Sequence, residues 1–236
     1  PETTAETSRH ESSPHWNYRD PESWADLDPA YAACGEGRAQ SPVDLTGSEP
    51  AELRDPVLDY PDTPVDVVDN GHTYQATPPE GAATMRLAGR TWRLLQWHVH
   101  APSEHLVDGR PAAAEVHLVH QAVQGDGDLA VLGILVEEGA ASTAMGGALG
   151  ARPPEAGTPG STRISLRELL PRSLGTVRYD GSLTTPPCSE GVHWLVATEP
   201  VTWSAEQVQA VRERFGGNAR PVQPRNARDL DRDEAG

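Results

Sequence analysis

Trp92-Arg-Leu-Leu-Gln-Trp-His-Val-His100 is the stretch of this sequence that says most about its fold. Its apolar and polar residues alternate as they do on a β-strand, where residues two apart point to the same face. Gln96, His98 and His100 therefore share one face of the predicted strand. A His-x-His pair on a strand is commonly no more than a surface pair, so its meaning depends on what lies beside it.

A second run, Glu115-Val-His-Leu-Val-His120, has the same pattern and places Glu115, His117 and Val119 on one face. Two neighbouring strands of this kind would bring three imidazole rings to one point. Three neutral ligands with a fourth position open are typical of a catalytic zinc site, whereas structural zinc sites usually have four ligands and are rich in Cys. The pattern thus favours a catalytic metal centre.

Gln96 and Glu115 each lie two residues from one of these histidines. An imidazole that binds a metal needs a partner for its second ring nitrogen, which fixes the tautomer and the ring orientation. The alternatives are a surface amide and a solvated charge at a sheet edge. A carboxylate inside an apolar run is costly unless it has a partner, so we expect both residues to support the metal ligands.

The composition excludes several classes of partner. The 236 residues suffice for one large domain, and 19 Arg with no Lys against 35 acidic residues give a net charge of −16. Nucleic acid and anionic membranes are poor partners for such a surface. No apolar stretch approaches the roughly 20 residues that span a bilayer. We expect a flexible tail at 1–14, one domain at 15–228 and a polar tail at 229–236.

Short β-like runs separated by Gly, Pro and Asp-Gly turns dominate the chain from Val57 onward. This spacing predicts a single domain that is mainly β, with a mostly antiparallel sheet. Two short helices are predicted, one opened by a Ser165–Glu168 capping box and one at 204–215. The Gly- and Ala-rich segment 139–160 is expected to be a surface loop with at most a brief helix. The predicted strands are 65–68, 72–76, 83–87, 90–100, 113–120, 129–137, 176–179 and 192–200.

Cys34 and Cys188 are the two cysteines of the chain. In a cytosolic protein they would usually be free thiols, and in an exported one they would more often be paired. Spacing alone does not decide between the two. The sequence begins at Pro1 rather than Met, from which we expect that a signal peptide has been removed.

Several further motifs accompany the histidines in a fixed order and carry a resemblance to a known family. They are HWNY (15–18), QSPVDL (40–45), NGHTYQ (70–75), QWHVHAPSEH (96–105), AEVHLVHQ (114–121), LAVLGILVE (129–137), YDGSLTTPPCSEGVHW (179–194) and RPVQPRNAR (220–228). The chain resembles the α-class carbonic anhydrases, most closely the bacterial exported members, over nearly its whole length from His15. The fold implied is a large twisted sheet with short peripheral helices.

The resemblance implies that His98, His100 and His117 bind Zn²⁺ and that the enzyme hydrates CO₂ reversibly to bicarbonate and a proton. Because the ligands are neutral, the ion would acidify a bound water to a pKa near 7, and this hydroxide would attack CO₂. Thr184 would accept the hydroxide's proton in a hydrogen bond and pass its own to Glu104, which orients the nucleophile.

Three further groups of residues follow from the same resemblance. His72 would be the proton shuttle, because an imidazole titrates near the operating pH. Polar residues of the cavity would organise the waters through which the proton moves: Tyr18, Asn70 and Gln75. The substrate pocket would consist of an apolar wall and one hydroxyl that contacts bicarbonate: Val119, Val131, Leu183, Val192, Trp194 and Thr185. An apolar pocket suits CO₂, which is small and uncharged.

Behind the site, His105, Glu115 and Tyr179 would form a buried polar network, and Cys34 and Cys188 would form the disulfide of exported members. The implied partners are CO₂, bicarbonate and water, with no nucleic acid and no membrane span. The implied location is periplasmic or secreted, and the assembly is a monomer or a homodimer. Inhibition by sulfonamides and a weak esterase side activity are also implied.

Two other functions are compatible with parts of this pattern. A non-catalytic zinc- or ligand-binding protein on the same fold would have lost a zinc-binding histidine, whereas all three are present here beside Glu104 and Thr184. A zinc hydrolase with a larger substrate would need more room than Val119 and Val131 leave. Both comparisons favour CO₂ hydration.

Overall fold

The two histidine-bearing runs form neighbouring antiparallel strands within a 13-stranded sheet. The computed structural model describes residues 15–152 and 155–233, so the predicted tail at 1–14 lies outside the described residues. Strand β6 (Arg90–His100) pairs with β9 (Ala114–Ala122), and His98 lies directly opposite His117. The predicted pair of strands is therefore confirmed, and the structure supplies its register.

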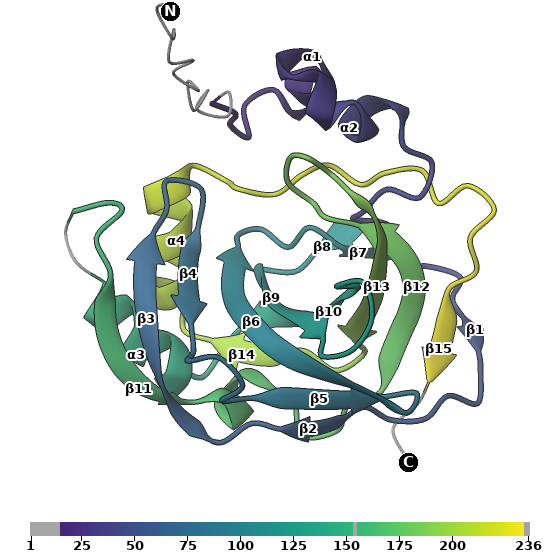
Figure 1. Ribbon diagram of the computed structural model, residues 1–236. Coiled ribbons are helices and arrows are strands. Elements are labelled where there is room, and N and C mark those ends of the chain that lie inside the picture. Colours follow the sequence, from purple (N-terminus) through teal and green to yellow (C-terminus); the bar gives the residue numbers. More distant parts are fainter. Residues whose placement is uncertain (1–14, 153–154, 234–236) are drawn as a thin grey trace, which may run out of the picture.

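The main path of the sheet runs β1-β15-β12-β13-β10-β9-β6-β4-β3-β11, with β14 on β10 and the β2–β5 pair on β6 (Figure 1). The remaining strands are β1 (Glu49–Pro50), β2 (Val57–Asp59), β3 (Asp62–Asp69), β4 (Tyr74–Thr77), β5 (Thr84–Leu87), β7 (Leu106–Val107), β8 (Arg110–Pro111), β10 (Leu129–Glu138), β11 (Gly160–Ser165), β12 (Thr176–Ser182), β13 (Glu190–Ala197), β14 (Val201–Trp203) and β15 (Asp231–Asp233). Strands β7 and β8 form a separate two-stranded sheet.

The large sheet is mixed. Most pairs are antiparallel, as predicted, but β13 and β14 both run parallel to β10, and β1 runs parallel to β15. Between β10 and β13 the chain passes through a helix and two further strands, and a long crossover of this kind is what parallel neighbours require. The segment named as a polar tail, 229–236, contributes β15, which pairs with β12 as well as β1.

One helical prediction needs correction. The Ser165–Glu168 capping box does not form: Leu166–Leu169 is one 3₁₀ turn, η3, and Ser165 makes no side-chain cap. Ser165 instead ends β11, and the Glu168 carboxylate accepts a hydrogen bond from the Thr143 hydroxyl. In the segment 139–160, where at most a brief helix was expected, the structure has the nine-residue helix α3 (Thr143–Ala151).

The second predicted helix is confirmed as α4 (Ala205–Phe215). Ser204 caps it through the backbone N–H of Gln207, whose side chain returns a hydrogen bond to the backbone of Ser204. Gly216 ends it with φ +68°, a left-handed conformation that favours glycine.

The sheet separates two apolar layers. Helices α3 and α4 cover one face, where Met145 and Val208 pack with Trp97 and Leu118 of β6 and β9. On the other face the apolar cluster includes Val119, Val131 and Trp194, which lie on the same side of the sheet as the histidines. Strands β6 and β9 thus bury one face in the main core and turn the other toward the site. Among the described residues, no helix is long and apolar enough to cross a membrane.

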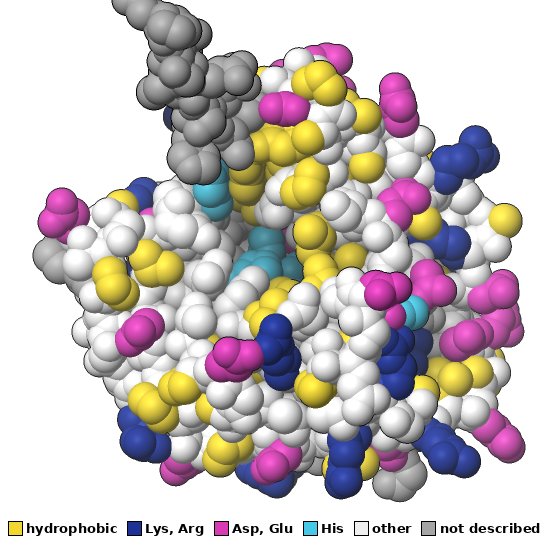
Figure 2. Space-filling view, viewed as in Figure 1, with side chains coloured by type: hydrophobic (Ala, Val, Ile, Leu, Met, Phe, Trp, Pro, Cys, Tyr) yellow, Lys and Arg dark blue, Asp and Glu magenta, His cyan; other side chains and the backbone are white. Residues whose placement is uncertain are grey.

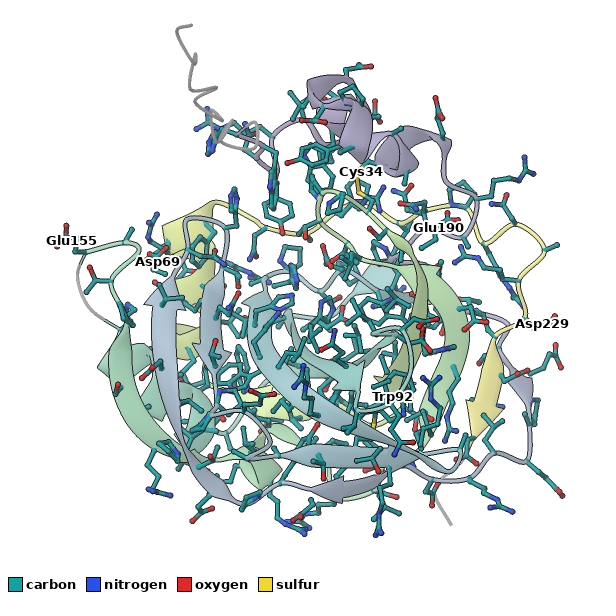
Figure 3. All side chains as sticks on the ribbon, viewed as in Figure 1. Cys34, Asp69, Trp92, Glu155, Glu190 and Asp229 are labelled. Carbon is teal, nitrogen blue, oxygen red and sulfur yellow. A yellow bond between two sulfur atoms is a disulfide. The ribbon has the colours of Figure 1, made fainter. Side chains whose placement is uncertain are left out.

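The N-terminal part folds into short turns above the sheet: η1 (Pro21–Ser23), α1 (Trp24–Leu27), η2 (Pro29–Tyr31) and α2 (Ala33–Glu36) (Figure 3). A disulfide joins Cys34 of α2 to Cys188 in the loop between β12 and β13, as predicted. The linked residues are 154 positions apart, and a cross-link closing so long a loop stabilises the fold by about 4–5 kcal/mol in the chain-entropy model.

Candidate metal centre

Three histidines from the two central strands meet at the bottom of a hollow. His98, His100 and His117 each offer a ring nitrogen, and these atoms lie within 4.8 Å of one another. His100 and His117 are buried, whereas His98 is partly exposed. Figure 2 shows histidine side chains at the base of this hollow, with hydrophobic side chains gathered along one of its sides.

The outer nitrogen of each ring faces an oxygen. Gln96 Oε1 lies 2.9 Å from His98 Nδ1, the Asn218 carbonyl lies 2.6 Å from His100 Nδ1, and Glu115 Oε1 lies 3.0 Å from His117 Nε2. An oxygen acceptor keeps a proton on the nitrogen that faces it, so the other nitrogen of each neutral ring carries a lone pair. The three rings therefore present lone pairs to a common point, which is what a cation requires of imidazole ligands.

This donor set fits a metal ion such as zinc. His100 Nε2 is buried and has no hydrogen-bond partner within the described part of the chain. Burial lowers the pKa of His100 to about 4 and also holds the pKa values of His98 and His117 below the usual range. The neighbouring rings lower the pKa of His98 further, so all three ligands stay neutral.

Glu115 lies at the centre of a buried polar network behind the rings. Burial would raise the pKa of its carboxyl, but His105 and His117 hold that pKa well below its usual range. Its Oε1 lies 2.7 Å from His105 Nδ1, and the Tyr179 hydroxyl lies 2.6 Å from His105 Nε2. Tyr179 in turn bonds Ser41 Oγ at 3.0 Å. Every predicted member of the network is in contact with the next.

Glu104 lies on the other side of the centre, 3.9 Å from His117. Its Oε1 accepts a hydrogen bond of 2.8 Å from the backbone of Arg220. Burial raises the pKa of Glu104 to about 7, against the opposing effects of His117, Arg220 and the Thr184 hydroxyl. No hydrogen bond of regular geometry joins Thr184 to Glu104, and Oε2, which is the oxygen 3.9 Å from His117 Nδ1, has no hydrogen-bond partner among the described residues.

Apolar side chains flank the centre where a pocket was predicted. Val119, Val131, Val192 and Trp194 are buried in one cluster, and Leu183 packs against it half-exposed. The Trp194 ring centroid lies 4.9 Å from that of His117. Leu183, Thr184 and Thr185 all belong to the loop that Cys188 ties to α2. The structure thus brings the predicted wall and both predicted threonines to the same side.

His72 lies at the rim, in the turn before β4 and not on the strand. Its ring stacks on Trp16 with centroids 3.9 Å apart, and it borders a pocket of about 330 Å³. Burial and the nearby His15 lower its pKa. The three predicted water-organising residues lie nearby: Tyr18 with its ring 6.4 Å from those of His72 and His100, and Asn70 within 3.5 Å of Gln75.

This arrangement has close counterparts among known proteins. A model of the eukaryotic-type carbonic anhydrase family matches residues 19–233. The chain belongs to the alpha carbonic anhydrases. It is 40% identical over 223 residues to a carbonic anhydrase of Pectobacterium atrosepticum, covering 92% of this chain and 90% of the relative. A carbonic anhydrase of Neisseria gonorrhoeae is 37% identical, with 96% and 91% covered.

Solved structures agree with this assignment. The alpha carbonic anhydrase of Thermovibrio ammonificans, determined with the inhibitor sulfanilamide, has a TM-score of 0.89 and 38% identity, covering 93% of this chain and all of the neighbour. The chain is thus a carbonic anhydrase, an enzyme of CO₂ hydration in a family that depends on zinc. The histidine cluster is where such an ion could bind.

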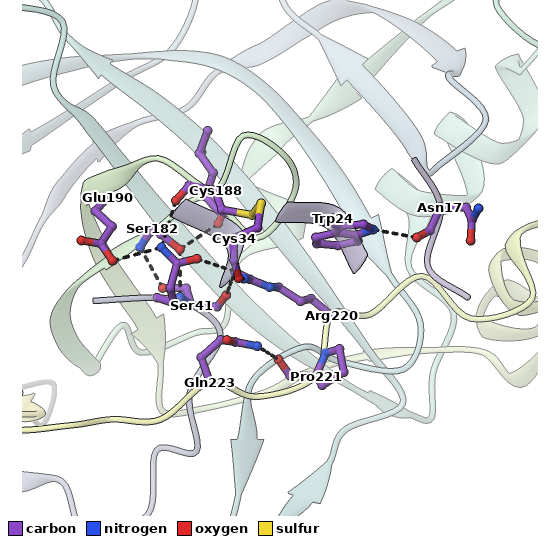
Figure 4. The surroundings of a disulfide bond; sticks show 12 residues. Asn17, Trp24, Cys34, Ser41, Ser182, Cys188, Glu190, Arg220, Pro221 and Gln223 are labelled. Carbon is purple, nitrogen blue, oxygen red and sulfur yellow. Dashed lines mark hydrogen bonds between the residues drawn. A yellow bond between two sulfur atoms is a disulfide. The ribbon is translucent and has the colours of Figure 1, made fainter. Parts of the chain in front are cut away.

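Three residues of this carbonic anhydrase were not singled out from the sequence. Asn218 faces His100 through its backbone carbonyl, which no side-chain pattern reveals. Arg220 is buried, and its guanidinium donates to the carbonyls of Cys34 and Ser41 and to Gln40 Oε1 (Figure 4). Trp16, which stacks on His72, was quoted only within the HWNY motif.

Proposed function

We propose that this chain hydrates CO₂ at a zinc ion held by His98, His100 and His117. The observation that carries the proposal is the orientation of the three rings, whose outer nitrogens all face oxygen acceptors while their inner nitrogens converge. Zinc, when bound there, would supply a Lewis-acidic centre that lowers the pKa of a water molecule to about 7.

Thr184 and Glu104 orient the attacking oxygen. The Thr184 hydroxyl accepts a hydrogen bond from that oxygen and donates its own proton toward Glu104, so a lone pair is aimed at the substrate carbon. The proximity that lets Thr184 lower the pKa of Glu104 supports this relay. Glu104 Oε2 accepts no hydrogen bond from the described residues, so it is available as the acceptor that the relay requires.

The apolar cluster receives the substrate. Its Val119, Val131, Leu183, Val192 and Trp194 side chains give CO₂ contact without offering hydrogen bonds, which an uncharged molecule does not need. Thr185, adjacent to Thr184 and partly exposed, offers a hydroxyl to bicarbonate as it leaves.

The first prediction is that purified protein holds about one zinc per chain and accelerates CO₂ hydration, measured by metal analysis and stopped-flow. Chelation should abolish the activity and added zinc should restore it, while a sulfonamide should inhibit it. Fully zinc-loaded protein without hydration activity would contradict the proposal and favour a non-catalytic binding protein.

The second prediction concerns the proton. His72 borders solvent at the rim, so it is placed to receive the proton through waters held by Tyr18, Asn70 and Gln75 and to pass it to buffer. His72→Ala should lower turnover in weak buffer roughly tenfold or more, with recovery on adding imidazole. Unchanged turnover would remove His72 from the reaction while leaving the zinc proposal intact.

Three further properties form part of the proposal. The nucleophile that attacks CO₂ can also attack an activated ester, which gives a weak esterase activity. The Cys34–Cys188 disulfide supports export to an oxidising compartment. We propose a monomer or a homodimer as the working assembly.

A further inference from the structure

The turn that carries His72 has no backbone pairing with the strand that carries two of the histidine ligands. Strand β4 pairs with β6 at only two positions, Gln75 with His98 and Ala76 with Trp97. The sheet ladder between β4 and β6 therefore stops short of the turn.

Beyond the end of this ladder, hydrogen bonds from side chains connect the turn to β6. The hydroxyl of Thr73 donates to the Val99 carbonyl at 2.5 Å and accepts from the Val99 N–H at 3.1 Å. The Asn218 amide donates to the same Val99 carbonyl at 2.9 Å and to the His72 carbonyl at 3.0 Å. Val99 lies between His98 and His100, and all the side chains that make these bonds are buried.

Asn218 is held on its other side as well. Its Oδ1 accepts a hydrogen bond of 2.8 Å from the backbone of Ala101, the residue that follows His100. The side chain thus bridges both sides of His100 and the turn of His72. The Asn218 amide is not part of the proton path, because all its hydrogen bonds are with backbone groups.

We propose that the Asn218 side chain, together with Thr73, is a positioning device that fixes the proton-accepting His72 relative to the strand of His98 and His100. This pair is called the Asn218–Thr73 clamp below. The proposal rests on the proposed function of His72.

The clamp matters because the His72 ring has few other restraints. Within residues 15–152 and 155–233 its ring nitrogens make no hydrogen bond. Trp16 stacks on one face, and the His15 and Tyr18 rings lie further away, with centroids at 5.9 Å and 6.4 Å. Inside the turn, Asn70 Oδ1 accepts from the His72 and Thr73 N–H groups, which shapes the turn but does not attach it to β6. The position of the His72 ring relative to β6 therefore depends on the backbone that the clamp holds, together with the stacking on Trp16. Transfer through a water chain depends steeply on such placement.

The test is a double-mutant cycle at saturating zinc. Asn218→Ala keeps the backbone carbonyl that faces His100, and Thr73→Val keeps the shape of the side chain. Both variants should lower turnover in weak buffer roughly five- to tenfold. In Thr73→Val, kcat/KM should stay within about twofold, because kcat/KM reports CO₂ attack and not proton release. Asn218 also faces the ligand His100, so its variant is judged by the loss of turnover in weak buffer and its recovery with imidazole. Imidazole should restore turnover in both variants.

In the His72→Ala background the same two substitutions should have no further effect on turnover, because a positioning residue acts only through the group it positions. If Asn218→Ala folds poorly, Thr73→Val still decides the matter. Additive losses in the double variants, or equal losses in kcat and kcat/KM of Thr73→Val, would overturn the proposal. If His72→Ala itself has no effect, the shuttle proposal fails instead.

A readout without metal completes the experiment. In metal-free protein, both variants should speed amide hydrogen exchange at residues 71–73 by about tenfold relative to β10. Gln207→Ala is the matched control, since Gln207 also bridges two backbone groups, the N–H and carbonyl of Ser142, but far from the site. It should lower stability without changing either the exchange of 71–73 or the buffer dependence. Unchanged exchange in the clamp variants would contradict the proposal.

Discussion

Each of the three ligand rings depends on a different kind of oxygen: a side-chain amide at His98, a backbone carbonyl at His100 and a carboxylate at His117. The carboxylate is ionised and buried, so its hydrogen bond with His117 is charge-assisted, and the same oxygen also bonds His105. The amide of Gln96 is only half-buried. The three acceptors therefore differ in charge and in burial. Of the two that are side chains, Gln96 can be replaced with less effect on the fold than the buried Glu115.

Gln96 offers the cleanest test of ring orientation. Gln96→Ala should weaken zinc binding about tenfold, because His98 Nδ1 loses the acceptor that fixes its tautomer. Competition with a chelator measures this. Gln121→Ala is the control, since Gln121 binds Arg93 and not a ligand. Equal zinc affinity in wild type and Gln96→Ala would show that the amide does not orient the ring.

At the scale of elements, β10 shapes the site through a residue with no side chain. Gly133 lies directly opposite His117 in the β9–β10 ladder. A Cβ at this position would lie 2.9 Å from Glu115 Oε1 and 3.6 Å from the Trp194 ring. The strand therefore leaves the space that the buried carboxylate occupies.

Gly133→Ala should displace Glu115 and so weaken both the fold and zinc binding. We expect a loss of about 1–3 kcal/mol in unfolding free energy and roughly tenfold in zinc affinity. Denaturant unfolding of metal-free protein and chelator competition measure the two. Gly150→Ala in α3 has open space around it and should be neutral or slightly stabilising. A Gly133→Ala protein that behaves like Gly150→Ala would contradict this account.

At the same scale, α3 shows why the sequence indicated at most a brief helix in 139–160. Its sequence, TAMGGALGA, has low helix propensity and no clear apolar stripe. Small residues nevertheless let it approach the sheet closely, where Ala144, Met145 and Ala148 are buried. Ser142 caps α3 by accepting a hydrogen bond from the Met145 N–H, and packing against β11 stabilises it. That packing is not visible as a local pattern.

At the scale of the whole molecule, buried neutral histidines make the stability of the fold sensitive to acid. His120 lies in the main core, on the face away from the metal centre, with the Tyr60 hydroxyl 2.5 Å from its Nε2. Burial lowers the pKa of His120 from 6.5 to about 4. Between these two pH values the unfolded chain binds a proton on His120 that the folded chain does not. The contribution of His120 to the unfolding free energy therefore falls as pH falls, and it levels off below about pH 4.

His120→Gln should remove this part of the acid sensitivity. A group that titrates at 6.5 unfolded and about 4 folded contributes about 2 kcal/mol to the stability lost between pH 7 and 4.5. Denaturant unfolding of the metal-free proteins at both pH values measures the difference. The variant should lose less stability than wild type over this interval, even if it is less stable at pH 7. Parallel losses in both proteins would show that His120 titrates normally in the fold.

The sequence by itself determined the two central strands, their shared face and the residues that converge on it, because alternation along a strand depends only on local geometry. It also determined α4, whose start and end are marked by local capping residues. Only the tertiary structure decided the parallel crossover from β10 to β13, the existence of α3, and the attachment of the His72 turn to β6. These depend on contacts between residues far apart in the chain, such as Asn218 with His72 and Val99, and no local pattern encodes them.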